Sequence, residues 1–265
     1  MPLQHDSFIL SSPGGRAVNE DACDAFRFGP DRFGREYFGW VLADGLGGHR
    51  GGETAARTAV EAISRYLAAP SAAPGSESAS ESGTSLSGQA LDGALRSAQS
   101  AILAARQREP RLARMHTTAV LLVSDGLRAR WAHLGDSRLY HFRAGRLAAS
   151  TRDHSVSYLL HLAGDIPWSA IRDHEDRNRL LRSLGSEGTW KPDILAQTLP
   201  LQPADAFLLC SDGFWEHVLE PEMETDLAAT TTAEEWIWKM ERRLLAKAPE
   251  GHDNYSAIAV KCNNE

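Results

Sequence analysis

The chain has 265 residues, of which 42% are hydrophobic and 24% charged, and its formal net charge is −7. This length is enough to bury one large core, and the acidic balance disfavours nucleic acids and anionic membrane surfaces, which are bound through clustered basic residues. The N-terminal residues resemble no secretory signal, and no apolar run approaches the roughly 18 residues that a membrane-spanning helix needs. We therefore expect a soluble, cytoplasmic protein.

Apolar and alternating runs predict short strands on both sides of a helical region. The predicted strands are residues 6–11, 24–29 and 36–44 before this region, and 117–124, 127–135, 137–145, 194–201, 206–211 and 255–262 after it. The three cysteines, Cys23, Cys210 and Cys262, lie far apart in the sequence. Their odd number argues against a disulfide framework or a zinc cluster, and Cys210 is predicted to be a buried core residue.

Two stretches between the strands have apolar residues at the spacing of an amphipathic helix. In residues 52–69 they are Ala55, Ala56, Ala59, Val60, Ile63 and Leu67, and in residues 90–109 they are Leu91, Leu95, Ala98, Ile102 and Ala105. Residues 69–88 are rich in Ser, Ala, Gly and Pro and can bury little apolar surface, which predicts a mobile linker between the two helices. A third helix is expected over residues 232–248.

The strands expected between residues 117 and 147 are separated only by residues 125–126, 135–136 and 144–145. Because parallel strands need a long crossover, such short turns indicate antiparallel hairpins. Strands that come in runs, with a few long helices between the runs, predict an α+β layered architecture, and we expect one domain over residues 1–265.

A glycine-rich stretch, VLADGLGGHRGGETAA at residues 41–56, joins an apolar strand to the first helix. It does not fit a dinucleotide-binding loop because Arg50 replaces the third glycine, and Glu53 at the lysine position argues against a Walker loop. A simple turn before the helix would account for the glycines. It does not account for Asp44, since a carboxylate at the end of a buried strand is costly unless it is paired or binds a cation.

Other acidic residues flank apolar strands in the same way. They are Glu20 and Asp21, Asp136, Asp212 and Asp253. Hard divalent cations prefer about six oxygen ligands, so we expect these side chains to form one metal cluster at the edge of a sheet. Asp125 stands in LLVSDG, which closely matches the LLCSDG that holds Asp212, but it lies between two alternating strands and is assigned to a hairpin turn.

Together these residues belong to eight blocks, RAVNED, ADGLGGHRGGE, HTTAVLLV, HLGDSRLY, TRDHS, RNRLLRSLG, LLCSDGFWE and GHDNYSAIAV. From residue 16 to residue 260, their order resembles that of the metal-dependent protein phosphatases, the type 2C Ser/Thr phosphatase family, in its bacterial branch. The resemblance implies a four-layer α-β-β-α sandwich, with two antiparallel sheets flanked by helices and a flap over about residues 153–185. It implies hydrolysis of phosphoserine and phosphothreonine by a water that bridges two Mn²⁺ or Mg²⁺ ions.

The resemblance also assigns the metal ligands. Asp44 would bridge the two ions, and Gly45 would contribute its carbonyl oxygen. Asp212 and Asp253 would complete the ligands of one ion. Asp136, together with Asp212, would hold a third, weaker ion.

Five further positions follow from the same comparison. Asp21 would reach the second ion through water and is preferred to its neighbour Glu20, which matches an acidic ligand of eukaryotic relatives. Arg16 would grip the substrate phosphate, and Asn254 would order waters around the ligands. Leu46 stands where many eukaryotic relatives have a histidine that is proposed to protonate the leaving group, which favours water as the acid.

Two other functions stay open at this point. One is a catalytically silent regulatory module of the same fold, which the retained aspartates and Arg16 argue against. The other is a hydrolase of a different phosphoester. The partners implied by the resemblance are phosphorylated proteins and a cognate Ser/Thr kinase, including kinases that control type VI secretion, and we expect a monomer.

Overall fold

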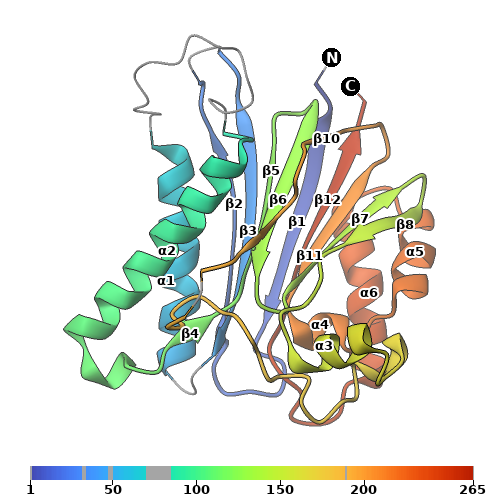
Figure 1. The fold of residues 1–265 in the computed structure, drawn as a ribbon. Coiled ribbons are helices and arrows are strands. Elements are labelled where there is room, and N and C mark those ends of the chain that lie inside the picture. The colour runs from blue at the N-terminus through green and yellow to red at the C-terminus, as the bar shows by residue number, and fades with distance from the viewer. Residues whose placement is uncertain (1, 32–33, 47–49, 70–84, 189, 265) are drawn as a thin grey trace.

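The computed structural model describes residues 2–31, 34–46, 50–69, 85–188 and 190–264. Two antiparallel sheets lie face to face, and helices cover both outer faces (Figure 1). The predicted α-β-β-α sandwich is therefore confirmed. Among the described residues, no helix is long and apolar enough to cross a membrane.

The first sheet has the strand order β1-β12-β11-β7-β8. Its strands are β1 (Gln4–Ser12), β7 (Arg138–Arg143), β8 (Arg146–Ser150), β11 (Ala206–Cys210) and β12 (Tyr255–Asn263). The second sheet has the order β10-β6-β5-β3-β2, with β4 paired to β3 and β9 paired to β6. Its strands are β2 (Asp21–Phe28), β3 (Tyr37–Leu46), β4 (His116–Thr117), β5 (Ala119–Ser124), β6 (Arg128–Leu134), β9 (Asp193–Ile194) and β10 (Leu199–Pro200).

Two long helices, α1 (Arg50–Ala68) and α2 (Gly88–Arg108), cover the second sheet. The apolar faces predicted for them are buried against it, apart from the partly buried Ala105. The shorter helices belong to the side of the first sheet. They are α3 (Val156–Ala163), α4 (Asp212–Trp215), α5 (Glu220–Ala228) and α6 (Ala233–Lys247), with the 3-10 turn η3 (Trp168–Ala170). A second 3-10 turn, η2 (Pro110–Leu112), follows α2 and packs with α1 and α2 on the side of the second sheet.

The core consists of three apolar layers. Trp40, Leu122, Phe207 and Ile258 lie between the two sheets, and separate clusters lie beneath the helices on either side. The buried, free thiol of Cys210 belongs to the layer beneath the shorter helices, as predicted.

One expected hairpin is wrong. The turns at residues 125–126 and 144–145 do join antiparallel neighbours, β5 with β6 and β7 with β8. The turn at residues 135–136 does not, because β6 belongs to the second sheet and β7 to the first. The chain crosses here from one sheet to the other.

The strand expected over residues 194–201 is reduced to the two short strands β9 and β10. Between them, the carbonyls of Leu195 and Ala196 accept hydrogen bonds from the Arg130 side chain. β8 was not expected, because its partly exposed residues lack an apolar pattern.

Most of the linker predicted over residues 69–88 lies outside the described residues. At its described end, Leu86 is buried and Ser87 caps α2 by accepting a hydrogen bond from Ala90 N at 3.1 Å.

Candidate metal centre

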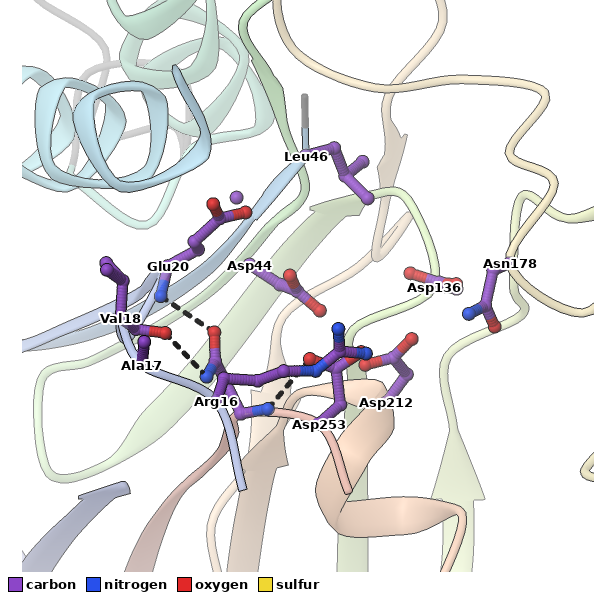
Figure 2. Close-up of a pocket in the computed structure, with 12 residues that line it drawn as sticks. Arg16, Ala17, Val18, Glu20, Asp44, Leu46, Asp136, Asn178, Asp212 and Asp253 are labelled. Carbon is purple, nitrogen blue, oxygen red and sulfur yellow. Dashed lines mark hydrogen bonds and ion pairs between the residues drawn. The ribbon is translucent and has the colours of Figure 1, made fainter. Parts of the chain in front are cut away.

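A cavity of about 400 Å³ opens at the end of the sandwich where α4 and β4 lie. Five acidic residues line it: Glu20, Asp44, Asp136, Asp212 and Asp253. Figure 2 shows Asp44, Asp136, Asp212 and Asp253 around one space, with the Arg16 side chain extending towards it. The structure thus brings together residues that are far apart in the sequence.

The backbone of Asp44 is fixed at the end of β3 by two neighbouring threonines. Asp44 N donates to Thr118 Oγ1 at 2.9 Å, and Asp44 O accepts from Thr118 N at 2.9 Å and from Thr117 Oγ1 at 2.7 Å. With the backbone held, the carboxylate faces the cavity. Burial, followed by the charge of Asp212, holds the pKa of Asp44 well above its usual range.

Close backbone packing brings Asp212 and Asp253 together. A Cβ on Gly213 would lie 2.1 Å from Asn254 O, so only glycine allows the first turn of α4 to approach the start of β12 this closely. Burial raises the pKa of Asp212. Asp253 is more exposed, and its Oδ2 pairs with Arg16 Nη2 at 3.1 Å.

Gly45 lines the cavity next to Asp44, at a point where β3 touches α1. A Cβ on Gly45 would lie 2.2 Å from Gly52 O and 2.6 Å from Glu20 O. Gly45 N also donates to Glu20 O at 3.1 Å. The glycines at these two positions therefore let three backbone segments meet beside the acids.

The two neighbouring acids Glu20 and Asp21 have different surroundings. Glu20 lines the cavity, whereas Asp21 is not among its lining residues. Asp21 lies between the sheets, where its Oδ2 accepts a hydrogen bond from Ser211 Oγ at 2.8 Å. Burial, partly offset by serine hydrogen bonds, raises the pKa of Asp21 to about 7.

Asn254 organises the loop that carries Arg16. Its Oδ1 accepts from Glu20 N at 2.8 Å, and its Nδ2 donates to Pro13 O and Val18 O at 2.8 and 2.9 Å. These bonds anchor the loop on both sides of Arg16. Asn254 therefore contributes to the site through the backbone that it holds.

Asn178 is a cavity residue that sequence reasoning did not single out. It approaches from the side of Asp136, as Figure 2 shows. Its neighbour Arg177 donates through Nε to Glu216 Oε1 at 2.6 Å, just beyond α4. Burial and the charge of Asp212 raise the pKa of Glu216 to about 7. Residues 177–178 begin the RNRLLRSLG block and lie in the predicted flap, but nothing in their local sequence distinguishes a residue that faces the cavity.

The donor set suits hard divalent cations. Among the described residues that line the cavity, five side chains are acidic and Arg16 alone carries a permanent positive charge. Burial, and after it the repulsion between carboxylates gathered in this way, raises the pKa values of Asp44, Asp136 and Asp212. Mg²⁺ and Mn²⁺ prefer such oxygen ligands. The fold and cavity suit a metal-dependent hydrolase of phosphate esters.

The model of the protein phosphatase 2C family matches residues 15–248. The chain belongs to this family. It is 31% identical over 227 residues to a serine/threonine phosphatase, Stp, of Listeria innocua, with 84% of each chain covered.

Solved structures agree with this classification. The catalytic domain of the phosphatase PstP, in complex with two manganese ions, has a TM-score of 0.78 and 27% identity, covering 99% of this chain and 100% of that one. PppA, described as a key regulatory component of the type VI secretion system in Pseudomonas aeruginosa, has a TM-score of 0.73 and 28% identity, with 97% of both chains covered.

Proposed function

We propose that this protein is a Mn²⁺- or Mg²⁺-dependent phosphatase of phosphoserine and phosphothreonine in proteins. The observation that carries the proposal is the cavity in which Asp44, Asp136, Asp212 and Asp253 converge and to which Arg16 contributes. Membership of the protein phosphatase 2C family and the relatives named serine/threonine phosphatases support it. A complete set of acids and the arginine argue against a catalytically silent module.

In this proposal, Asp44, Gly45 O, Asp212 and Asp253 would provide the oxygen ligands of two ions, and Asp44 would contribute to both. Asp136 with Asp212 would hold a third, weaker ion. The ions, when bound, offset the negative charge of the phosphate and lower the pKa of a water so that it can attack phosphorus. The manganese ions of the related PstP support this choice of metal.

We further propose that Glu20, rather than Asp21, faces the second ion. Glu20 lines the cavity, whereas the carboxylate of Asp21 is engaged with Ser211 between the sheets. Asp21 would act on the site through its charge and its serine contacts. Metal titrations of Glu20→Gln and Asp21→Asn distinguish the two assignments, and the larger loss of affinity is expected for Glu20→Gln.

Arg16 would bind the substrate phosphate. A guanidinium can donate two parallel hydrogen bonds to non-bridging phosphate oxygens, and it stays charged at any physiological pH. The contact with Asp253 holds Arg16 at the cavity. Asn178 would add an amide on the opposite side, and since Leu46 has no proton to give, water would protonate the leaving serine or threonine oxygen.

We propose that the protein acts as a monomer in the cytoplasm and opposes a bacterial Ser/Thr kinase. The similarity to PppA makes a kinase of a type VI secretion system one candidate. Phosphoproteomics of a deletion strain would identify the substrates.

The test is hydrolysis of a phosphothreonine peptide by the purified protein with Mn²⁺, with EDTA, and by the Asp212→Asn variant. We expect turnover only with Mn²⁺ and a loss of at least about a hundredfold in the variant, since the ions lose one negatively charged ligand. Circular dichroism confirms that the variant is folded. Turnover in EDTA, or a fully active variant, would contradict the proposal.

A further inference from the structure

The turn that carries Asp136 has an unusual backbone. Gly135 has a φ of 111°, and a Cβ at this position would lie 2.6 Å from Thr118 Cγ2. Only glycine fits there. The direction of the Asp136 side chain therefore depends on how the peptide groups of Gly135 are held.

Both backbone polar groups of Gly135 are bonded to one residue, His154. His154 N donates to Gly135 O at 2.9 Å, and Gly135 N donates to His154 Nδ1 at 3.1 Å. For Nδ1 to accept, the imidazole must be neutral and carry its proton on Nε2. Burial lowers the pKa of His154 to about 4, so this form persists at physiological pH.

We propose that His154 is a positioning residue, whose imidazole Nδ1 and backbone N–H fix Gly135 so that the carboxylate of Asp136 points into the cavity. The inference rests on the proposed function, in which Asp136 is an ion ligand. A second anchor lies on the other side of the turn, where Trp215 Nε1 donates to Asp136 O at 3.0 Å. The turn is thus held from two directions, by the segment before α3 and by α4.

The surroundings of His154 favour this role over a separate metal site. His133, His154 and Asp193 lie close enough to suggest such a site. However, the two imidazole rings are stacked, with centroids 4.7 Å apart and an interplanar angle of 12°. Lone pairs that lie in parallel ring planes do not converge on one ion. His133 Nε2 also bonds to Arg152 O at 2.8 Å, and Nδ1 of His154 is occupied by Gly135. His133 therefore supports the ring of His154.

Two substitutions of similar polarity separate the positioning role from simple packing. In His154→Asn, the amide oxygen can take the place of Nδ1, whereas in His154→Gln it reaches the region of Nε2. Mn²⁺ binding is measured on the metal-free protein by isothermal titration calorimetry. We expect His154→Gln to lower the Mn²⁺ affinity of the site at Asp136 about tenfold, which is in the range known for residues that orient metal ligands. The affinity of His154→Asn should stay within about twofold of the original.

Hydrogen exchange at the Gly135 amide, followed by NMR, provides a readout independent of metal. Protection should be lost in His154→Gln and retained in His154→Asn. If His154→Gln does not fold, His154→Ala replaces it, and the same loss of Gly135 protection and of Mn²⁺ affinity is expected. Equal behaviour of the Asn and Gln variants, in both metal affinity and exchange, would overturn the inference.

A double-mutant cycle with Asp136→Asn shows whether His154 acts through Asp136. In that background His154→Gln should cause no further loss of Mn²⁺ affinity. If the two losses add, the positioning role is wrong although the ion assignment stands. If Asp136→Asn itself leaves Mn²⁺ binding unchanged, the ion assignment in the proposed function fails, and the inference fails with it.

Discussion

Replacing Gly45 by alanine tests whether close backbone packing builds the metal centre. The added Cβ would lie 2.2 Å from Gly52 O and 2.6 Å from Glu20 O. Both are backbone atoms, so no side chain can rotate away, and β3 must separate from α1 and from the loop before β2. An overpacked site of this kind costs about 1–3 kcal/mol. For a chain of this size, 2 kcal/mol corresponds to a Tm decrease of about 4–8 °C.

Thermal unfolding of the metal-free protein measures this effect, and Mn²⁺-dependent hydrolysis of a phosphothreonine peptide measures its consequence. We expect a large loss of hydrolytic activity even at temperatures where the variant is fully folded, because the displaced segments carry Asp44 and Glu20. Gly51→Ala is the matched control in the adjacent helix, since its Cβ would make only an ordinary contact of 3.7 Å with Met115 Cβ. Its Tm should be unchanged or higher, because alanine favours a helix by up to about 1 kcal/mol. A Gly45→Ala protein with the Tm and activity of the original would refute the packing argument.

Three further predictions concern single side chains. Asp153→Asn should destabilise the protein by about 3–5 kcal/mol in urea unfolding, because the buried Arg138 guanidinium loses its bidentate carboxylate partner and keeps only Glu220, at 3.7 Å; the Arg138 and Asp153 side chains are both 1% exposed. Arg16→Ala should weaken inhibition by inorganic phosphate about tenfold, while calorimetry shows unchanged Mn²⁺ affinity. Burial lowers the pKa of His5 from 6.5 to about 4, so the unfolded chain takes up this proton at a higher pH than the folded protein. The free energy of unfolding should therefore fall by up to about 3 kcal/mol as the pH drops from 6.5 towards 4. His5→Gln should make this dependence of stability on pH less steep.

Each of these predictions has a contrasting outcome. Arg146→Ala removes an exposed ion pair with Glu224 and should change stability by less than about 1 kcal/mol. If Arg146→Ala lowers the free energy of unfolding as much as Asp153→Asn does, burial of the ion pair does not explain the loss of stability in Asp153→Asn. Loss of Mn²⁺ affinity in Arg16→Ala would show that this residue supports the ions, and an unchanged pH slope in His5→Gln would assign the acid sensitivity to other groups.

The convergence of Asp44, Asp136, Asp212 and Asp253 was predictable because each stands beside an apolar strand. Strand ends at one edge of a sandwich meet in space, and a buried acid needs a partner. The choice between Glu20 and Asp21 was not predictable in the same way. Asp21 lies opposite Asp44 in the register of β2 against β3, so the two side chains are on the same face of the sheet, where Asp21 accepts a hydrogen bond from Ser211. Glu20 precedes β2 and lines the cavity, and this difference between the two acids depends on tertiary contacts.

Tertiary contacts also account for the other differences. Residues 135–136 look like a hairpin turn locally, and only the position of β6 and β7 in different sheets shows the crossing. Asn178 faces the cavity because the segment around it is held elsewhere, through Arg177 with Glu216 and through the pairing of Arg179 O with Val156 N at 3.0 Å. No periodicity in the sequence encodes such contacts.

In the proposed function, Asp44 would join the ions of one metal centre. Mn²⁺ binding to the metal-free protein, measured by isothermal titration calorimetry for the original chain and for Asp44→Asn, tests it directly. We expect at least two bound ions in the original protein and loss of the tight binding in the variant. Equal stoichiometry and affinity in the two proteins would contradict it.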